Sequence, residues 1–237
     1  MAVSPQKTAD SLTADYGSYV HPNKNKDSPF SALLVGVPGA GKSFVIKKLA
    51  ETHPEHNAVI LNIGDLMYEL ALSKYSGVIT NRDDMRNKLT QTQQETLRDE
   101  AIKNVAQKTQ QKGATYFIDT HLTVENPAGY LGGVPPAFFN TLKPDFILLV
   151  EDTPDAISRR RTKDNNAGKR VRDPNQNKID HHQRLNRLVA EKITSNANIP
   201  LLITGYSPDG DEGAKKDAQT IHKFLKENAT KMRQTTN

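Results

Sequence analysis

The chain has 237 residues, enough for one α/β domain with polar ends. It contains no cysteine, which excludes disulfides, thiolate metal sites and cysteine nucleophiles, and it has no apolar run long enough to span a bilayer. A net charge of +5 is modest for this length, so general binding to nucleic acid is not expected.

The first segment of the chain, residues 1–28, is polar and holds few large apolar side chains. This composition is typical of a disordered leader, and it lacks the apolar stretch of a signal peptide. We therefore expect a cytoplasmic protein that is not attached to a membrane. The folded domain is predicted at residues 29–227, and residues 228–237 are predicted to be a flexible polar tail.

Residues 36–43 (GVPGAGKS) match every position of the phosphate loop G-x-x-x-x-G-K-[ST]. An apolar run at residues 30–35 predicts a buried strand before the loop, and residues 44–51 have apolar positions at helical spacing. In a loop that lies between a strand and a helix, the backbone N–H groups and the positive end of the helix dipole face the phosphates of a nucleotide. In such a loop Lys42 can reach the β- and γ-phosphates, and the Ser43 hydroxyl can ligate Mg²⁺. An accidental glycine-rich turn would not need these flanking elements. The predicted nucleotide-binding residues here are Gly36, Val37, Pro38, Gly39, Ala40, Gly41, Lys42, Ser43 and Phe44.

Four further apolar runs predict strands, and the segments between them have helical patterns. Near-continuous apolar strands are typical of a parallel sheet that is covered on both faces. The pattern predicts a doubly wound, five-stranded parallel sheet with ligands at the carboxyl ends of its strands. The predicted strands are residues 58–62, 115–119, 145–150 and 200–204, and the helices are 65–72, 92–110, 154–161, 177–195 and 211–226.

Asp119 ends the third predicted strand, at the same sheet edge as the phosphate loop. A carboxylate there is suited to hold Mg²⁺, usually through water, and the alternative is a turn cap assisted by Thr120. The next residue, His121, either contacts substrate or is structural.

A second group of polar residues follows the second strand. Asp65 lies in the segment GDLM, and Arg82 and Arg86 have the i, i+4 spacing of one helical face. A nucleotide kinase needs fixed cations for the acceptor phosphate, because two polyanions must approach each other. A solvated charged surface is an equally good interpretation of these residues.

The most basic segment spans residues 159–174. Between positions 159 and 172 there are seven Lys or Arg residues and a single acid, Asp164, with a predicted flexible loop at residues 165–168. We expect a lid that closes over phosphates, whereas a solvated loop or an RNA-binding patch are the alternatives. The segment has no aromatic residue to stack on bases, which weakens the RNA interpretation. The predicted lid residues are Arg160, Arg161, Arg170 and Arg172.

On the following helix, Asn186 and Arg187 either complete the phosphate or base contacts or line an exposed face.

Taken together, these segments resemble the archaeal-type adenylate kinases over residues 30–204. The resemblance includes GVPGAGKS, NIGDLMYELA at 62–71, RDDMR at 82–86, RR at 160–161, RD at 172–173 and HQ-x-x-NR at 182–187. Its most specific part is DTHLTVENPAGYLGGVP at 119–135, which a generic phosphate-loop protein does not require. Where many adenylate kinases have an arginine this chain has Tyr68, so the resemblance assigns the AMP phosphate to Arg82 and Arg86.

The resemblance implies a P-loop fold with an NMP-binding segment, the Mg²⁺-dependent reaction ATP + AMP ⇌ 2 ADP, and a homo-oligomer, often a trimer. Two alternatives stay open. One is a kinase for another nucleotide or a small phosphorylated metabolite. The other is a nucleotide-switched ATPase that binds RNA or protein, which would hydrolyse ATP slowly without an acceptor.

Overall fold

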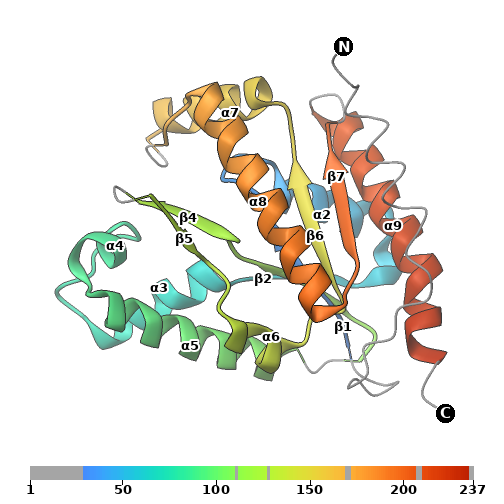
Figure 1. Cartoon of the computed structure of the whole chain (residues 1–237), viewed down its shortest axis with the longest axis horizontal. Coiled ribbons are helices and arrows are strands. Elements are labelled where there is room, and N and C mark those ends of the chain that lie inside the picture. The colour runs from blue at the N-terminus through green and yellow to red at the C-terminus, as the bar shows by residue number, and fades with distance from the viewer. Residues whose placement is uncertain (1–28, 110–111, 127–128, 169–171, 207–209, 235–237) are drawn as a thin grey trace.

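The computed structural model describes residues 29–109, 112–126, 129–168, 172–206 and 210–234, and the predicted leader lies outside them. A central sheet is covered by helices on both faces (Figure 1). Its five strands are all parallel and have the order β2-β3-β1-β6-β7, which confirms the predicted sheet. These strands are β1 (Phe30–Val35), β2 (Ala58–Asn62), β3 (Thr115–Asp119), β6 (Phe146–Glu151) and β7 (Leu201–Gly205).

The alternation of side chains along β1 explains the two layers of helices. Ala32 and Leu34 point to one face of the sheet, into a cluster with α2 and α9, whereas Leu33 and Val35 point to the other face, toward α3, α5, α6 and α8. All four side chains are fully buried, as expected for a central parallel strand. The helices are α2 (Lys42–Thr52), α3 (Ile63–Lys74), α4 (Asp84–Lys88), α5 (Gln91–Lys108), α6 (Pro136–Leu142), α7 (Pro154–Asn166), α8 (Gln176–Ala197) and α9 (Asp211–Gln234), with a 3₁₀ turn, η1, at Pro54–His56.

Local capping sets where several helices begin. Thr90 and Gln93 form a reciprocal capping box at α5, and Thr153 caps α7 immediately before Pro154. Asn175 caps α8 in the same way. These side chains satisfy N–H groups that have no partner within the helix.

The structure differs from the sequence expectations at several places, which include two short helices, α4 and α6, that were not predicted. The residues between β3 and α6 form an antiparallel hairpin of β4 (Thr123–Asn126) and β5 (Gly129–Gly132), which the sequence did not predict because both strands are short. The predicted loop at 165–168 is wrong in its first half, since α7 continues through Asn166. Helix α9 continues to Gln234, into the segment expected to be a flexible tail.

Because the sheet strands are parallel, their carboxyl ends meet at one edge. The phosphate loop, Asn62, Asp119 and Glu151 all lie at this edge. Among the helices of the described residues, none combines the length and the apolarity that crossing a bilayer requires.

Candidate active site

The phosphate loop connects β1 to α2, and two of its glycines have backbone conformations that other residues rarely adopt. Gly41 precedes α2 with φ 95°, and Gly36 has φ 146°. A Cβ atom on Gly36 would lie 2.3 Å from the carbonyl oxygen of Val150 on the adjacent strand. The loop therefore needs glycine at these positions, and its shape leaves the first N–H groups of α2 without helical partners, which suits them to bind phosphate.

Lys42 lies at the start of α2 and is buried, with 9% of its area exposed. Its Nζ donates to the carbonyl oxygen of Gly36 at 3.1 Å and lies 3.6 Å from Oδ1 of Asp119. Asn62 donates from Nδ2 to Oδ2 of Asp119 at 2.7 Å. A lysine and an amide thus hold the Asp119 carboxylate at the end of β3.

The oxygen atoms at this position suit Mg²⁺, which prefers carboxylate, hydroxyl and phosphate oxygens and keeps several water molecules. The Ser43 side chain is exposed on the first turn of α2, and Asp119 is fixed at the neighbouring strand end. Since Asp119 already contacts Lys42 and Asn62, a role through bound water fits the geometry.

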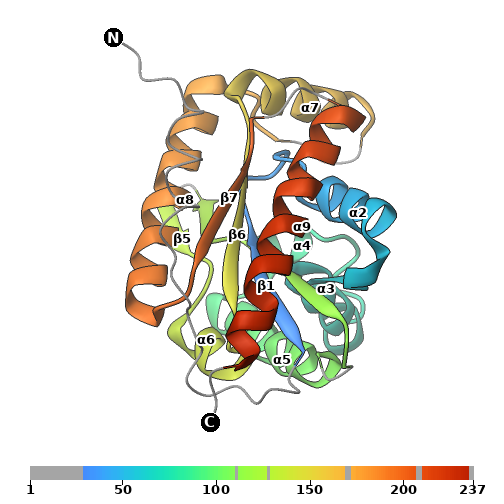
Figure 2. The ribbon, with the colours of Figure 1, turned by 90° about the vertical axis from the view of Figure 1, so that its right-hand side faces the viewer.

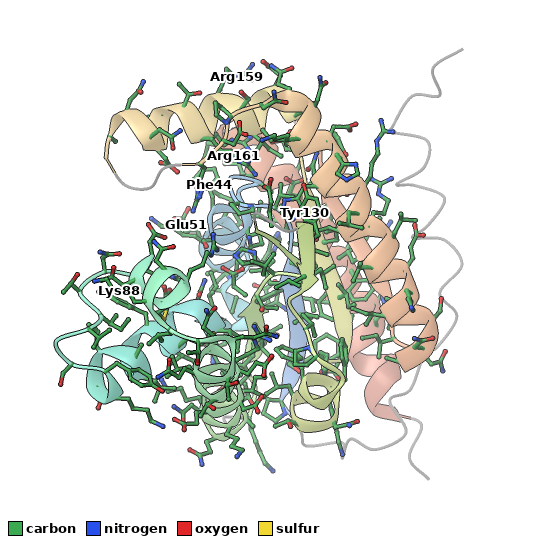
Figure 3. The ribbon with its side chains drawn as sticks, turned by 60° about the vertical axis from the view of Figure 1, so that its left-hand side comes forward. Phe44, Glu51, Lys88, Tyr130, Arg159 and Arg161 are labelled. Carbon is green, nitrogen blue, oxygen red and sulfur yellow. The ribbon has the colours of Figure 1, made fainter. Side chains whose placement is uncertain are left out.

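Helix α7 places two of the predicted lid arginines against the phosphate loop. Nη1 of Arg160 donates to the carbonyl oxygen of Gly39 at 3.1 Å, and Nε of Arg161 donates to that of Pro38 at 3.0 Å. In Figure 3, Arg161 lies on the side of α7 toward the loop and Phe44, whereas Arg159 lies on the outer side. The two guanidinium groups therefore border the space where the phosphates of a bound nucleotide would lie.

After α7, Arg172, Asp173 and Pro174 lie beside that helix. Asn165 accepts from the backbone N–H of Arg172 at 2.8 Å and donates to its carbonyl oxygen at 2.7 Å. Burial, and next the nearby Arg172, lower the pKa of Arg161, so two cations are held close together. Such a pair favours an anion between them. Arg170 lies outside the described residues.

Beside Asp119 there is a pocket of about 190 Å³ between helices α3, α4 and α5 and the hairpin. Arg82 is fixed in it by an ion pair with Asp65 and by a hydrogen bond from Nη2 to Oδ1 of Asn62 at 3.1 Å. Within the described part of the chain, the side chains of Arg86 and Arg98 make no ion pair and no hydrogen bond. The lining residues include Asn62, Gly64, Arg82, Arg86, Gln94, Arg98, Asp119, Thr120, His121 and Phe138.

Two guanidinium groups without partners in a small pocket are suited to bind a phosphate. In Figure 3, α4, marked by Lys88, lies well below α7, so the two groups of arginines come from different elements.

His121 also lines this pocket and is largely enclosed. Burial, followed by the charge of Lys42, lowers the pKa of His121 to about 3, so the imidazole is neutral at pH 7. A neutral imidazole donates or accepts a hydrogen bond without adding charge to the pocket.

The structure places Asn186 and Arg187 on α8, in contact with other parts of the protein. Asn186 is buried and its Oδ1 accepts from Oγ1 of Thr123 in the hairpin at 2.6 Å. Arg187 forms an ion pair with Glu151, which raises the pKa of the arginine. Both residues hold the sheet edge and the hairpin in place, and their predicted nucleotide contacts stay a prediction.

Sequence reasoning missed Asn62 and Arg98. Asn62 carried a usable signal, since it is a polar residue at the end of a predicted strand, like Asp119. Arg98 carried none, because it is one of many charged residues on the long helix α5 and only the fold brings it to the pocket.

Known proteins resemble both the sequence and the fold. A family model described as an AAA domain matches residues 35–180. The adenylate kinase of Pyrococcus furiosus is 37% identical over 198 residues, which cover 83% of this chain and 95% of that protein. The adenylate kinase of Thermococcus kodakarensis is 37% identical over 200 residues, covering 83% and 95%. A shikimate kinase from Acinetobacter baumannii has a similar fold, with a TM-score of 0.50 at 14% identity over 85% of this chain and 95% of that one.

Proposed function

Since this chain belongs to the archaeal-type adenylate kinase family of P-loop nucleoside monophosphate kinases, we propose that it transfers the terminal phosphoryl group of ATP to AMP, giving two ADP, with Mg²⁺. One observation carries the proposal: two cationic sites share Asp119. The carboxylate lies 3.6 Å from Lys42 of the phosphate loop and also lines the arginine pocket. A donor and an acceptor phosphate bound at these sites would meet beside it.

On the donor side, the N–H groups at the start of α2 and the Lys42 ammonium bind the β- and γ-phosphates. Ser43 and Asp119 would hold Mg²⁺, which neutralises charge on the phosphate oxygens when bound. Asn62 keeps the Asp119 carboxylate oriented. These groups are fixed before ATP arrives, so little reorganisation is needed during the reaction.

On the acceptor side, Arg86 and Arg98 bind the AMP phosphate, and Arg82, fixed by Asp65, completes that site. The arginines of the basic segment, Arg160, Arg161 and Arg172, stabilise the negative charge that spreads over the γ-phosphoryl oxygens during transfer. No covalent nucleophile is required, because positioning and charge stabilisation supply the catalysis.

The test is a coupled assay of initial rates with ATP–Mg²⁺ and each of AMP, CMP, GMP and UMP. We expect fast ADP formation with AMP, little without an acceptor, and loss of activity when EDTA removes the metal. Slow hydrolysis that does not depend on any acceptor would contradict the proposal and favour a switch ATPase. Turnover with only a different acceptor would keep the kinase and change its substrate.

The family resemblance also leads us to propose a cytoplasmic homo-oligomer, with a trimer as the expected form. Light scattering coupled to size-exclusion chromatography measures this mass directly, and a purely monomeric protein at assay concentration would contradict it.

A further inference from the structure

Three histidines and a glutamate gather at the end of α2 that is remote from the phosphate loop. His53, Glu55 and His56 lie in or beside η1, and His222 lies on α9, which packs against α2 (Figure 2). Within the described residues, His53, Glu55 and His222 each offer one ligand atom, and these atoms lie within 4.8 Å of one another.

The distances in this cluster match those around a small metal ion. Nδ1 of His53 lies 3.5 Å, and Nδ1 of His222 lies 3.4 Å, from Oε1 of Glu55. Ligands at 2.0–2.1 Å in a tetrahedral site are separated from one another by roughly 3.3 to 3.4 Å. In the metal-free protein, Nε2 of His56 and Nδ1 of His222 share a hydrogen bond of 2.9 Å, which metal binding at His222 would replace.

The hydrogen bonds orient the donor atoms toward one another. Nε2 of His53 lies 3.0 Å from Oε1 of Gln219, and because an amide oxygen only accepts, His53 carries its proton on Nε2. Nδ1 of His53 therefore faces the Glu55 carboxylate. A metal ion held between this nitrogen and the carboxylate would take the place of a proton. An outer amide that accepts from the second nitrogen is also the usual support of a metal-bound histidine.

Solvent access also favours metal binding. The side chains of His53 and His222 are each 18% exposed, which leaves an entry route from solvent.

The rings of His53 and His222 are stacked, with centroids 3.8 Å apart and planes at 11°. They must tilt apart for both Nδ1 lone pairs to point at one ion. The part-exposed edge of the cluster leaves room for this movement.

We propose that His53, Glu55 and His222, with a water molecule as the fourth ligand, bind one divalent transition-metal ion, Zn²⁺ foremost, that joins the end of α2 to α9. Imidazole nitrogens and a carboxylate are suited to Zn²⁺, whereas Mg²⁺ prefers oxygen ligands in an octahedron. The site is separate from the nucleotide site, since the length of α2 from Lys42 to His53 is roughly 16 Å. Metal binding here can therefore be tested independently of the proposed kinase activity.

The test uses the full chain, treated with EDTA and then dialysed, without nucleotide. We expect calorimetric titration to give one Zn²⁺ per chain. At a free Zn²⁺ concentration of about one hundred times Kd, binding to the folded state alone raises Tm by roughly 5 to 10 °C. Co²⁺ should give the visible absorption of a tetrahedral site without thiolate bands, since the chain has no cysteine. Mg²⁺ at the same concentration should give neither effect.

The variants His222→Gln and Glu55→Gln should lose the Tm increase and the Co²⁺ absorption, and Gln219→Ala should weaken Zn²⁺ binding by roughly 10- to 100-fold. His181→Gln, which removes an exposed imidazole elsewhere, is the matched control and should bind Zn²⁺ as the original chain does. The Tm of each metal-free variant shows that it is folded, and Glu55 is exposed enough that its variant should fold normally. No Zn²⁺ binding below millimolar concentration, or equal binding by all variants, would overturn the proposal.

Discussion

Lys42 combines a structural contact with the charge that the proposed reaction needs. It is held by the Gly36 carbonyl oxygen and lies beside Asp119, so its ammonium group has a fixed position. The Gly36 carbonyl oxygen and the Asp119 carboxylate offset the cost of burying the Lys42 ammonium group, so this group is already in place to bind the donor phosphates.

We expect Lys42→Ala to leave the protein folded and to lower kcat/KM by about 10²- to 10³-fold, because it removes a charge that stabilises the transferring phosphoryl group. Initial rates and the thermal midpoint measure the two effects separately. Lys47→Ala, an exposed lysine on the same helix, is the control and should change neither. Near-normal activity of folded Lys42→Ala would contradict phosphoryl transfer at this loop.

The arginines of the acceptor pocket differ in how they are held. The Arg82 side chain is fixed by protein groups, whereas the side chains of Arg86 and Arg98 make no hydrogen bond or ion pair with other described residues. Groups without protein partners are the ones that a phosphate would satisfy.

Arg86→Ala and Arg98→Ala should each raise KM for AMP by at least about tenfold and change KM for ATP much less, because the lost binding is confined to one substrate. Steady-state kinetics with each substrate varied in turn measure this difference. Arg184→Ala, at an exposed position of α8, is the matched control. Equal effects on both KM values would mean that the pocket does not bind the acceptor.

At the scale of elements, α7 and the segment that follows it form one structural unit. The arginines of α7 bind carbonyl oxygens of the phosphate loop, and Asn165 joins the end of the helix to Arg172 by two hydrogen bonds. The sequence predicted a flexible loop at Asn165. In the structure, the Asn165 side chain bonds both the N–H and the carbonyl oxygen of Arg172 and so holds Arg172 beside the end of α7. The unit can therefore direct several guanidinium groups to one place.

Arg172→Ala should lower kcat more than it raises either KM, because a guanidinium that bridges two phosphoryl oxygens acts chiefly during transfer. Arg172→Lys should restore little activity, since an ammonium group lacks the planar pair of donors. The kcat and KM values of the two variants measure this. If Arg172→Ala leaves turnover unchanged but abolishes RNA binding in a gel shift, the segment is a recognition patch.

Asn165→Ala tests whether positioning of that segment matters. Both hydrogen bonds to the Arg172 backbone are lost, so the segment should become more mobile and kcat should fall by about tenfold, with little change in the global thermal midpoint. Limited proteolysis between residues 165 and 173 should become faster in the variant. Unchanged kcat together with faster proteolysis would show that an ordered segment is not needed for turnover.

In the molecule as a whole, four histidines make stability depend on pH. Burial lowers the pKa values of His121, to about 3, and of His56, His182 and His222. Below pH 6.5 the unfolded chain therefore binds more protons at these side chains than the folded chain does. Stability is therefore fully present above pH 6.5 and falls as the pH is lowered toward 3.

His121 alone should cost about 2 kcal/mol of unfolding free energy between pH 7 and pH 5. We expect His121→Gln to reduce the loss in this interval by about that amount, and urea unfolding at the two pH values measures it. The exposed His181→Gln serves as the control and should leave the pH dependence unchanged. An unchanged dependence in His121→Gln would mean that this imidazole is protonated in the folded protein.

Local sequence patterns were sufficient to predict the sheet, the phosphate loop and the family. Each of the five strands is a near-continuous apolar run, and the loop is a continuous motif between a strand and a helix, so neighbouring residues carry the whole signal. The position of Asp119 at the sheet edge also followed from the sequence, because parallel strands share their carboxyl ends.

Which distant residues meet became clear from the folded protein alone. It brings Arg98 of α5 into the pocket beside Asp119, Arg161 of α7 onto the Pro38 carbonyl oxygen, and His222 of α9 next to η1. These contacts join segments that are far apart in the chain, and they depend on how helices pack on the two faces of the sheet. A charged or imidazole side chain on an amphipathic helix has the same local pattern whether it faces solvent or a site, so its role is settled by packing and not by its neighbours in sequence.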